Sequence, residues 1–244
     1  MKRLARQVAR RFGYRLRPVD PYFHPGAIRK FNADPDNPYL ISFPRTGSHW
    51  LRMLVELYYE RPLLVRSFYF PHRTDFLLVH DHDMDLQVDR RSVLYLFRNP
   101  VDTIYSQLSY HREPLDSPLR IAHWAGRYAL HLAKWLVDRR GFGRFTVLRY
   151  EAMKADLSAE FARVIEHLGG TFDADRLQHV QARVTREEVK DRVTYNDQVM
   201  TLGDGYESAR DRFRREQDGR VWDAIRAVSH TVYGDADAIP RHLT

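Results

Sequence analysis

The chain has 244 residues, 43% of them apolar and 13% aromatic, which suits one α/β domain with a sizeable buried core. It contains no cysteine, which excludes disulfides, thiolate metal sites and cysteine catalysis. No apolar run approaches the length of a membrane span, and the N-terminus lacks the apolar segment of a secretory signal, so we expect a cytoplasmic protein that contacts a membrane at most at its surface.

The formal net charge of +7 is concentrated at the N-terminus. Residues 1–17 carry many basic side chains and no acidic one, so the rest of the chain is close to neutral and a nucleic-acid binder is not favoured. Leu4, Val8, Phe12 and Leu16 recur every four residues, which predicts a basic amphipathic helix. Two interpretations stay open: contact with an anionic membrane surface, or packing on the chain's own domain.

Beyond this arm, strands and helices alternate. Residues 18–38 are expected to form an irregular lead-in, so we divide the chain into an arm and lead-in, 1–38, and one domain, 39–244. Strands are predicted at 39–43, 76–79, 93–97 and 145–148. Helices are predicted from Trp50, from Pro100, over 119–137, before Gly169, after Thr185 and around 221–228. This alternation predicts a central parallel β-sheet flanked by helices.

The first strand runs into a short polar loop, Pro44 to His49, and then into a helix. Backbone N–H groups at a helix N-terminus attract anions, and Gly47 lets a ligand approach the backbone closely. Arg45 adds a planar cation, and Thr46 and Ser48 add hydroxyl groups. This is not the nucleotide-triphosphate loop, because the first glycine and the lysine of that motif are missing.

A second motif follows the strand at 93–97. Arg98 ends the strand, Asn99 is a helix cap and Pro100 suits the first helical position. Ser106 lies two turns into the predicted helix. The strand predicted at 145–148 is followed by Arg149, Tyr150 and Glu151.

Histidine and aspartate alternate over 80–83, directly after the strand predicted at 76–79. Such a cluster could ligate a divalent transition metal or form a solvated turn. Because no partner ligands occur elsewhere at a motif spacing, we expect no metal.

These segments resemble the sulfotransferases that use 3′-phosphoadenosine-5′-phosphosulfate, PAPS, over about residues 39–170. The loop from Phe43 to Trp50 is similar to the family's phosphosulfate loop, with Arg45 in place of the lysine of cytosolic members, and the resemblance implies donor contacts by Thr46, Gly47, Ser48, His49 and Trp50 as well. It also implies that Arg98 and Ser106 bind the 3′-phosphate and that Tyr150 lies near the adenosine. The family's C-terminal R-K-G-x-x-G loop is missing here, and Arg210 or Arg212 is a candidate to replace it.

The resemblance further implies a P-loop-like fold, PAPS as donor, the desulfated nucleotide PAP as product and no metal. Arg45 would stabilise charge on the leaving group. A histidine after a strand would be the catalytic base, and His82 is favoured over His80, with a neighbouring aspartate as orienting group or alternative base.

The acceptor stays open: a hydroxyl or amine of a glycan, a lipid or a small molecule. Four aromatic residues are candidates for lining its pocket, although core packing is the more common role: Tyr69, Phe70, Trp124 and Tyr128. Two other functions are weighed. A P-loop kinase or nucleotide hydrolase is disfavoured by the missing lysine, and a non-catalytic domain that binds anionic surfaces would depend on residues 1–17.

Overall fold

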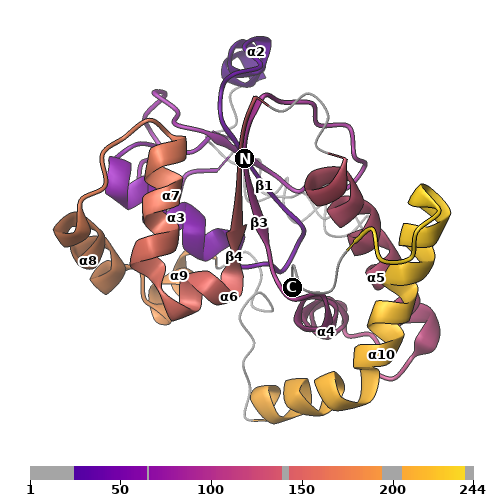
Figure 1. The fold of residues 1–244 in the computed structure, drawn as a ribbon. Helices are drawn as coiled ribbons and strands as arrows, with labels where there is room; N and C mark the ends of the chain where they lie inside the picture. Colours follow the sequence, from indigo (N-terminus) through magenta and orange to yellow (C-terminus); the bar gives the residue numbers. More distant parts are fainter. Residues whose placement is uncertain (1–24, 65, 139–142, 194–204, 240–244) are drawn as a thin grey trace, which may run out of the picture.

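The computed structural model describes residues 25–64, 66–138, 143–193 and 205–239 (Figure 1). The basic segment 1–17 lies outside the described residues. Within the described ranges, none of the helices combines the length and the apolar character needed to cross a membrane.

A four-stranded sheet forms the centre of the molecule, with the order β2-β1-β3-β4. The strands are β1 (Tyr39–Ser42), β2 (Val79–Asp81), β3 (Ser92–Phe97) and β4 (Arg144–Arg149). All three pairings are parallel, with Leu40 opposite both His80 and Leu94 in the register of the sheet. The predicted parallel α/β fold is therefore confirmed.

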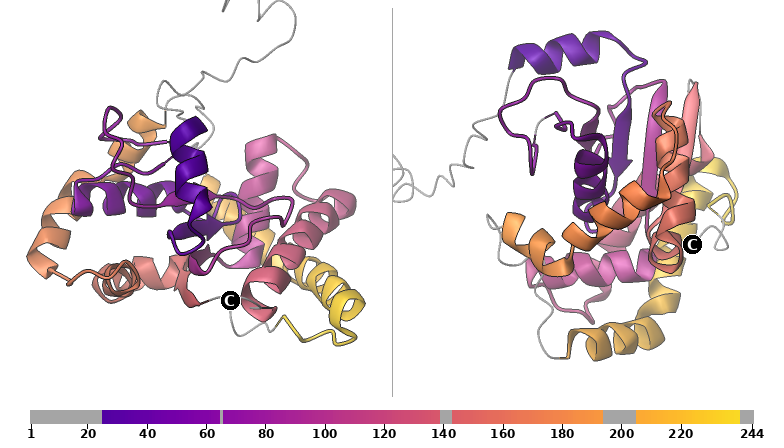
Figure 2. Two further views of the ribbon diagram at one scale, coloured as in Figure 1. Left: turned by 90° about the horizontal axis from the view of Figure 1, so that it is seen from above. Right: turned by 90° about the vertical axis from the view of Figure 1, so that its left-hand side faces the viewer.

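Helices cover both faces of the sheet (Figures 1 and 2). One face carries α3 (Ser48–Tyr59), α7 (Leu157–His167), α8 (Ala174–Arg183) and α9 (Arg186–Arg192). The other carries α4 (Pro100–His111), α5 (Pro118–Leu132) with the π-helical turn η1 (Ala133–Val137), and α10 (Tyr206–Tyr233). The short α6 (Tyr150–Ala155) directly follows β4.

Strand side chains alternate between the two faces, as the two-residue period of a strand requires. Tyr39, Ile41 and Tyr95 belong to the core cluster beneath α4, α5 and α10. Leu40 and Leu94 belong to the cluster beneath α3 and α7. Because both faces are buried, the central strands β1 and β3 are apolar except for Ser42 at the end of β1 and Ser92 at the start of β3.

Parallel strands place their carboxyl ends at one edge of the sheet, and here that edge is followed by α3, α4 and α6. Helix α2 (Pro25–Ala33) lies at the opposite edge (Figures 1 and 2). In a doubly covered parallel sheet, ligands bind at the carboxyl edge. The fold thus brings the loops that follow β1, β2, β3 and β4 together.

Some elements differ from the sequence-based expectation. Helix α2 occupies part of the lead-in that we expected to be irregular, because Pro25 suits a first helical position. Strand β2 starts at Val79 rather than at residue 76, because Val79, His80 and Asp81 are the residues that pair with β1. The capped helix after Thr185 is confirmed, since the Thr185 hydroxyl accepts the Glu188 N–H at 3.2 Å.

Candidate active site

The loop between β1 and α3 leaves the N-terminus of α3 open. Gly47 precedes the helix with φ +94°, and no side chain among the described residues caps the first N–H groups of the helix. A Cβ atom on Gly47 would lie 2.5 Å from the Tyr150 ring, so only glycine fits beneath that ring. Uncapped N–H groups beside a residue without a side chain can bind an anion.

Arg45 connects this loop to the second motif. Its backbone has φ +74°, an uncommon conformation for a residue other than glycine. Its Nε donates to the Ser106 hydroxyl at 3.1 Å, and its guanidinium lies 4.8 Å from the centre of the Tyr110 ring. Two residues that the sequence assigned to separate donor contacts therefore touch each other.

The other loop residues divide into two roles. The buried Thr46 hydroxyl donates to the Phe43 carbonyl at 2.8 Å, so this side chain stabilises the loop. Ser48 begins α3 and is buried. The His49 ring packs edge-on against Phe68, and Trp50 packs edge-on against Tyr150.

Arg98 lies at the end of β3, beside the same loop. Its Nη1 donates to the Arg45 carbonyl at 3.2 Å, and its guanidinium stacks 4.8 Å from the centre of the Tyr150 ring. The Tyr128 hydroxyl, from α5, donates to the Arg98 carbonyl at 2.8 Å and accepts a hydrogen bond from the backbone N–H of Arg98 at 3.2 Å. Arg45, Gly47, Arg98, Ser106 and Tyr150 thus form one contiguous group.

Two further residues at this group were not predicted. Glu151 accepts the Asn99 N–H at 3.0 Å through Oε1, and its position directly after a strand end was the available signal. Arg214, on α10, makes a two-pronged pair with Asp102 at 2.6 and 2.5 Å, and Asp102 lies 3.8 Å from Arg98. The structure thus brings Arg214, which the sequence did not single out, to this motif, while Arg210 and Arg212 stay candidates on the same helix.

Several polar atoms in this group have no hydrogen-bond partner among the described residues. They include Arg98 Nε and Glu151 Oε2, both buried. A buried polar atom without a partner is costly, and a bound ligand with matching groups would satisfy it. The group is therefore suited to an anionic ligand that also carries hydrogen-bond donors.

His80 lies on β2, and both of its ring nitrogens are engaged. Arg52 Nη1 lies 3.4 Å from His80 Nδ1, and because arginine only donates, Nδ1 accepts. Nε2 then carries the proton and donates to the Ser42 hydroxyl at 2.9 Å. Burial, followed by the charge of Arg52, holds the pKa of His80 well below its usual value of 6.5.

His82 has the opposite tautomer. Its Nδ1 lies 2.7 Å from the Ser42 carbonyl, which only accepts, so Nδ1 carries the proton. Nε2 is then an unprotonated nitrogen, and no hydrogen bond from the described residues engages it. Burial also lowers the pKa of His82, while the bond to Ser42 opposes that shift.

The two aspartates of this segment make hydrogen bonds of their own. Asp83 is buried and accepts from Lys134 Nζ at 2.5 Å and from Trp135 Nε1 at 3.1 Å. Asp81 is exposed and accepts the Asp83 N–H at 2.6 Å. Neither carboxylate is hydrogen-bonded to a ring of His80 or His82, and the described part of the chain contains no metal-ligating cluster.

Cationic groups surround His80 and His82, and they also act on another histidine, His49. Burial lowers the pKa of His49 well below 6.5, and the charges of Arg52 and Arg66 add to the shift, with His82 and Arg45 contributing further. Neutral imidazoles beside fixed guanidinium groups suit a ligand that brings negative charge.

The aromatic residues considered for an acceptor pocket are placed differently from one another. Tyr128 is fully buried, and Trp124 is buried with its Nε1 donating to Glu113 at 2.8 Å. Tyr69 and Phe70 are only partly buried, and the backbone N–H of Tyr69 donates to the buried Glu56 carboxylate at 3.0 Å. Core packing therefore accounts for the two α5 residues.

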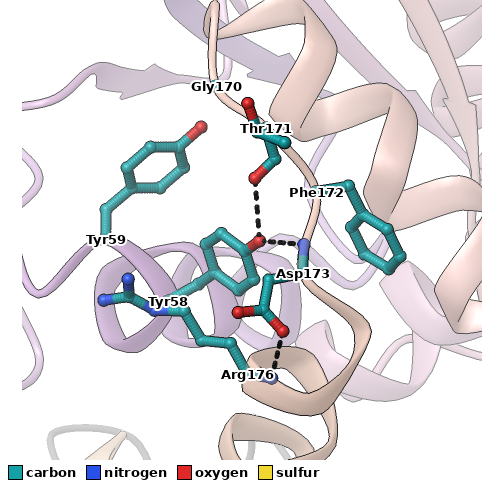
Figure 3. A pocket seen from close by; sticks show the side chains of 7 residues that line it. All are labelled: Tyr58, Tyr59, Gly170, Thr171, Phe172, Asp173 and Arg176. Atoms are coloured by element: carbon teal, nitrogen blue, oxygen red, sulfur yellow. Dashed lines mark hydrogen bonds between the residues drawn. The ribbon is translucent and has the colours of Figure 1, made fainter.

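A cavity of about 600 Å³ lies at the far end of α3, beside Tyr58, Tyr59 and Arg176 (Figure 3). The Tyr58 hydroxyl accepts the Asp173 N–H at 2.7 Å and donates to the Thr171 carbonyl at 3.3 Å. These hydrogen bonds connect α3 to the loop that precedes α8. None of the predicted site residues lines this cavity.

Solved structures of similar fold include two protein–nucleotide complexes. Mouse sulfotransferase SULT7A1, complexed with PAP, has a TM-score of 0.51 and 16% identity, over 87% of this chain and 95% of that one. Retinol dehydratase, in a complex with retinol and PAP, has a TM-score of 0.55 and 16% identity, over 83% of this chain and 85% of that one. At such identities the likeness shows the fold.

Curated sequences add relatives of known class. Sulfotransferase 2A2 of Rattus norvegicus is 24% identical over 211 residues, which are 71% of this chain and 73% of that protein. Sulfotransferase 6B1 of Homo sapiens is 26% identical over 202 residues, which are 67% of this chain and 65% of that protein.

The sulfotransferase domain model matches residues 85–228, more than half of the chain. The matched stretch contains Arg98, Ser106 and Tyr150, while the loop at Arg45 and Gly47 precedes it. The chain belongs to the sulfotransferase family and is an enzyme of sulfuryl transfer.

Proposed function

We propose that this enzyme transfers the sulfuryl group of PAPS to a hydroxyl or amine of a small-molecule acceptor and releases PAP. The observation that carries the proposal is the meeting of two anion-binding motifs. Arg45 contacts Ser106 at 3.1 Å and accepts a bond from Arg98 at 3.2 Å, beside the uncapped N-terminus of α3. A nucleotide with phosphates at both ends requires such a pair of neighbouring sites.

The donor would be held by groups of both motifs. The N–H groups at the start of α3 suit the 5′-phosphate, and Arg98 with Ser106 suits the 3′-phosphate. Tyr150, which stacks on Arg98 and covers Gly47, would lie next to the adenosine. Thr46, His49 and Trp50 shape the loop around the donor.

His82 would serve as the base. An oxygen or nitrogen of the acceptor forms a bond to sulfur while the bond from sulfur to the 5′-phosphate oxygen breaks. The proton of the acceptor passes to Nε2 of His82, and the Arg45 guanidinium stabilises the charge on the departing oxygen. His80 holds Ser42 instead, since both of its nitrogens are engaged.

We infer the class of acceptor from proteins of similar fold. Retinol dehydratase has been solved with retinol and with androsterone, each together with PAP. These are small apolar alcohols, which supports a small-molecule acceptor for this enzyme.

Calorimetric titration with PAP, 5′-AMP and ADP tests the donor site. We expect PAP to bind at least about tenfold more tightly than 5′-AMP, because the 3′-phosphate gains charged hydrogen bonds from Arg98. Arg98→Ala should abolish this preference. Arg226→Ala, which removes an exposed arginine paired with Asp223 on α10, is the matched control and should bind like the wild type.

Equal affinities for PAP and 5′-AMP would overturn the PAPS proposal. A preference for ADP would favour a nucleotide kinase instead.

A further inference from the structure

A third histidine, His131, lies behind the predicted base. It sits in the last turn of α5, fully buried, and burial lowers its pKa to about 3. The ring is therefore neutral at neutral pH and carries one proton. Its Nε2 lies 3.0 Å from the His82 carbonyl, which only accepts, so Nε2 is the donor.

The other nitrogen of His131 completes a directed chain of hydrogen bonds. Nδ1 must accept, and the Tyr95 hydroxyl lies 2.9 Å away as its donor. Tyr95 is on β3 and is fully buried. The order of donation runs from Tyr95 to His131 and from His131 to the backbone of His82, so the tautomer of His131 is fixed.

The π-helical turn η1, which follows His131, binds Asp83, the residue directly after His82. Lys134 and Trp135 both donate to the Asp83 carboxylate, at 2.5 and 3.1 Å. Lys134 also donates to the Val88 carbonyl at 2.7 Å. Asp83 has φ +43°, a strained conformation that such partners must maintain.

His82 is thus held from two sides. Its ring donates to the Ser42 carbonyl on β1, and its carbonyl accepts from His131 on α5. We propose that His131, with Lys134 and Trp135 of the π turn, forms a clamp that orients His82 for proton transfer, an inference that rests on the proposed function. His131 is a positioning residue, because it acts through His82.

The test compares two buried histidines. His131→Phe removes the donor to His82, whereas His131→Gln keeps an N–H group near the position of Nε2. The matched control is His167→Phe, because His167 is also buried, with ring nitrogens 3.1 Å from the Ser92 hydroxyl and 2.9 Å from the Thr146 hydroxyl, remote from His82. His131→Met fills the same space without polar atoms and replaces His131→Phe if that variant does not fold.

Nitrogen NMR of the histidine rings gives the first readout, with His82 identified by comparison with His82→Gln. In the wild type we expect His82 to carry its proton on Nδ1. In His131→Phe we expect a mixture of tautomers or an exchange-broadened His82 signal, with the wild-type pattern kept in His131→Gln and His167→Phe. This readout needs no acceptor and no donor.

Turnover gives the second readout. We expect His131→Phe to lower kcat at least about tenfold with the KM for PAPS unchanged, and His131→Gln to restore most of it. An unchanged His82 signal and unchanged kcat in His131→Phe would overturn the clamp. Failure of PAP binding in the wild type would overturn the proposed function instead, so the two failures are distinct.

Discussion

At the scale of single residues, hydrogen-bond direction distinguishes two neighbouring histidines. The rings of His80 and His82 lie 4.7 Å apart, and both residues are partly buried. Arginine only donates and a carbonyl only accepts, so Arg52 and the Ser42 carbonyl fix opposite tautomers. The result leaves Nε2 of His82 as the nitrogen able to accept a proton.

His82→Gln should therefore lower kcat by about a hundredfold or more, because proton transfer by a positioned base contributes that much. His80→Gln should have the smaller effect. The measurement is transfer from radiolabelled PAPS to a mixture of phenols and sterols, with PAP affinity as the control for intact donor binding. Equal losses in the two variants would contradict the assignment.

The pH profile of the same reaction checks the protonation state of His82. Burial lowers its pKa from 6.5, and a base must be unprotonated to act. Activity should therefore rise with pH and reach half of its maximum below pH 6.5. A half-maximum above that value would mean that another group is the base.

Sequence patterns allowed the residues of the proposed donor loops to be named because those residues lie in short motifs. They did not predict Arg214, because its partner Asp102 lies 112 positions earlier in the chain. Nor could they distinguish His80 from His82 by their hydrogen bonds, because the partners Ser42 and Arg52 lie on other elements of the fold. Local motifs can be identified in a sequence, whereas contacts between distant segments require the fold.

At the scale of elements, the strong local signals gave the right structures. Asn99 caps α4 by accepting the Val101 N–H at 2.9 Å, and Pro100 begins the helix, as predicted. Gly169 has φ +74° just after α7, which fits its predicted place at a helix end. Helices α2, α6 and α8 were not predicted, because they are short and take their stability from tertiary packing.

Helix α10 contacts the proposed donor site through Arg214. Arg214 pairs with both oxygens of Asp102, and the buried Asp102 also lies 3.8 Å from Arg98. Arg214 is about half exposed, so the pair adds little to stability. Its effect is to satisfy Asp102, which leaves Arg98 available to a ligand.

Arg214→Ala should weaken PAP binding by roughly five- to tenfold, because the unsatisfied carboxylate of Asp102 would draw Arg98 toward itself. Arg214→Lys should have an intermediate effect, since it keeps the charge without the planar fork. Calorimetry with PAP is the measurement, and Arg215→Ala, an exposed neighbour on α10, is the control. Unchanged affinity in Arg214→Ala would contradict this role.

At the scale of the whole molecule, buried histidines make the fold sensitive to acid. The pKa of His131 is about 3 and that of His167 about 4, both lowered first by burial. An unfolded histidine titrates near 6.5, so between pH 6.5 and pH 4 the unfolded chain binds more protons than the native one. The free energy of unfolding must therefore fall as the pH falls through this range.

Urea unfolding at pH 7 and pH 5 measures this dependence. His131→Gln removes one titrating group and keeps its hydrogen bond to His82. The loss of stability between the two pH values should then be smaller than in the wild type by on the order of 2 kcal/mol. An identical loss in both proteins would show that His131 does not titrate on unfolding.

The parallel sheet also affects how the enzyme folds. The contact between Arg45 and Ser106 joins positions 61 residues apart, and the sheet contains no local hairpin that could form it early. Closing such long loops is slow, and their contacts form only when most of the sheet has assembled. We therefore expect the proposed nucleotide site to form late in folding, so that a ligand that binds it stabilises the native state rather than a folding intermediate that still lacks the site.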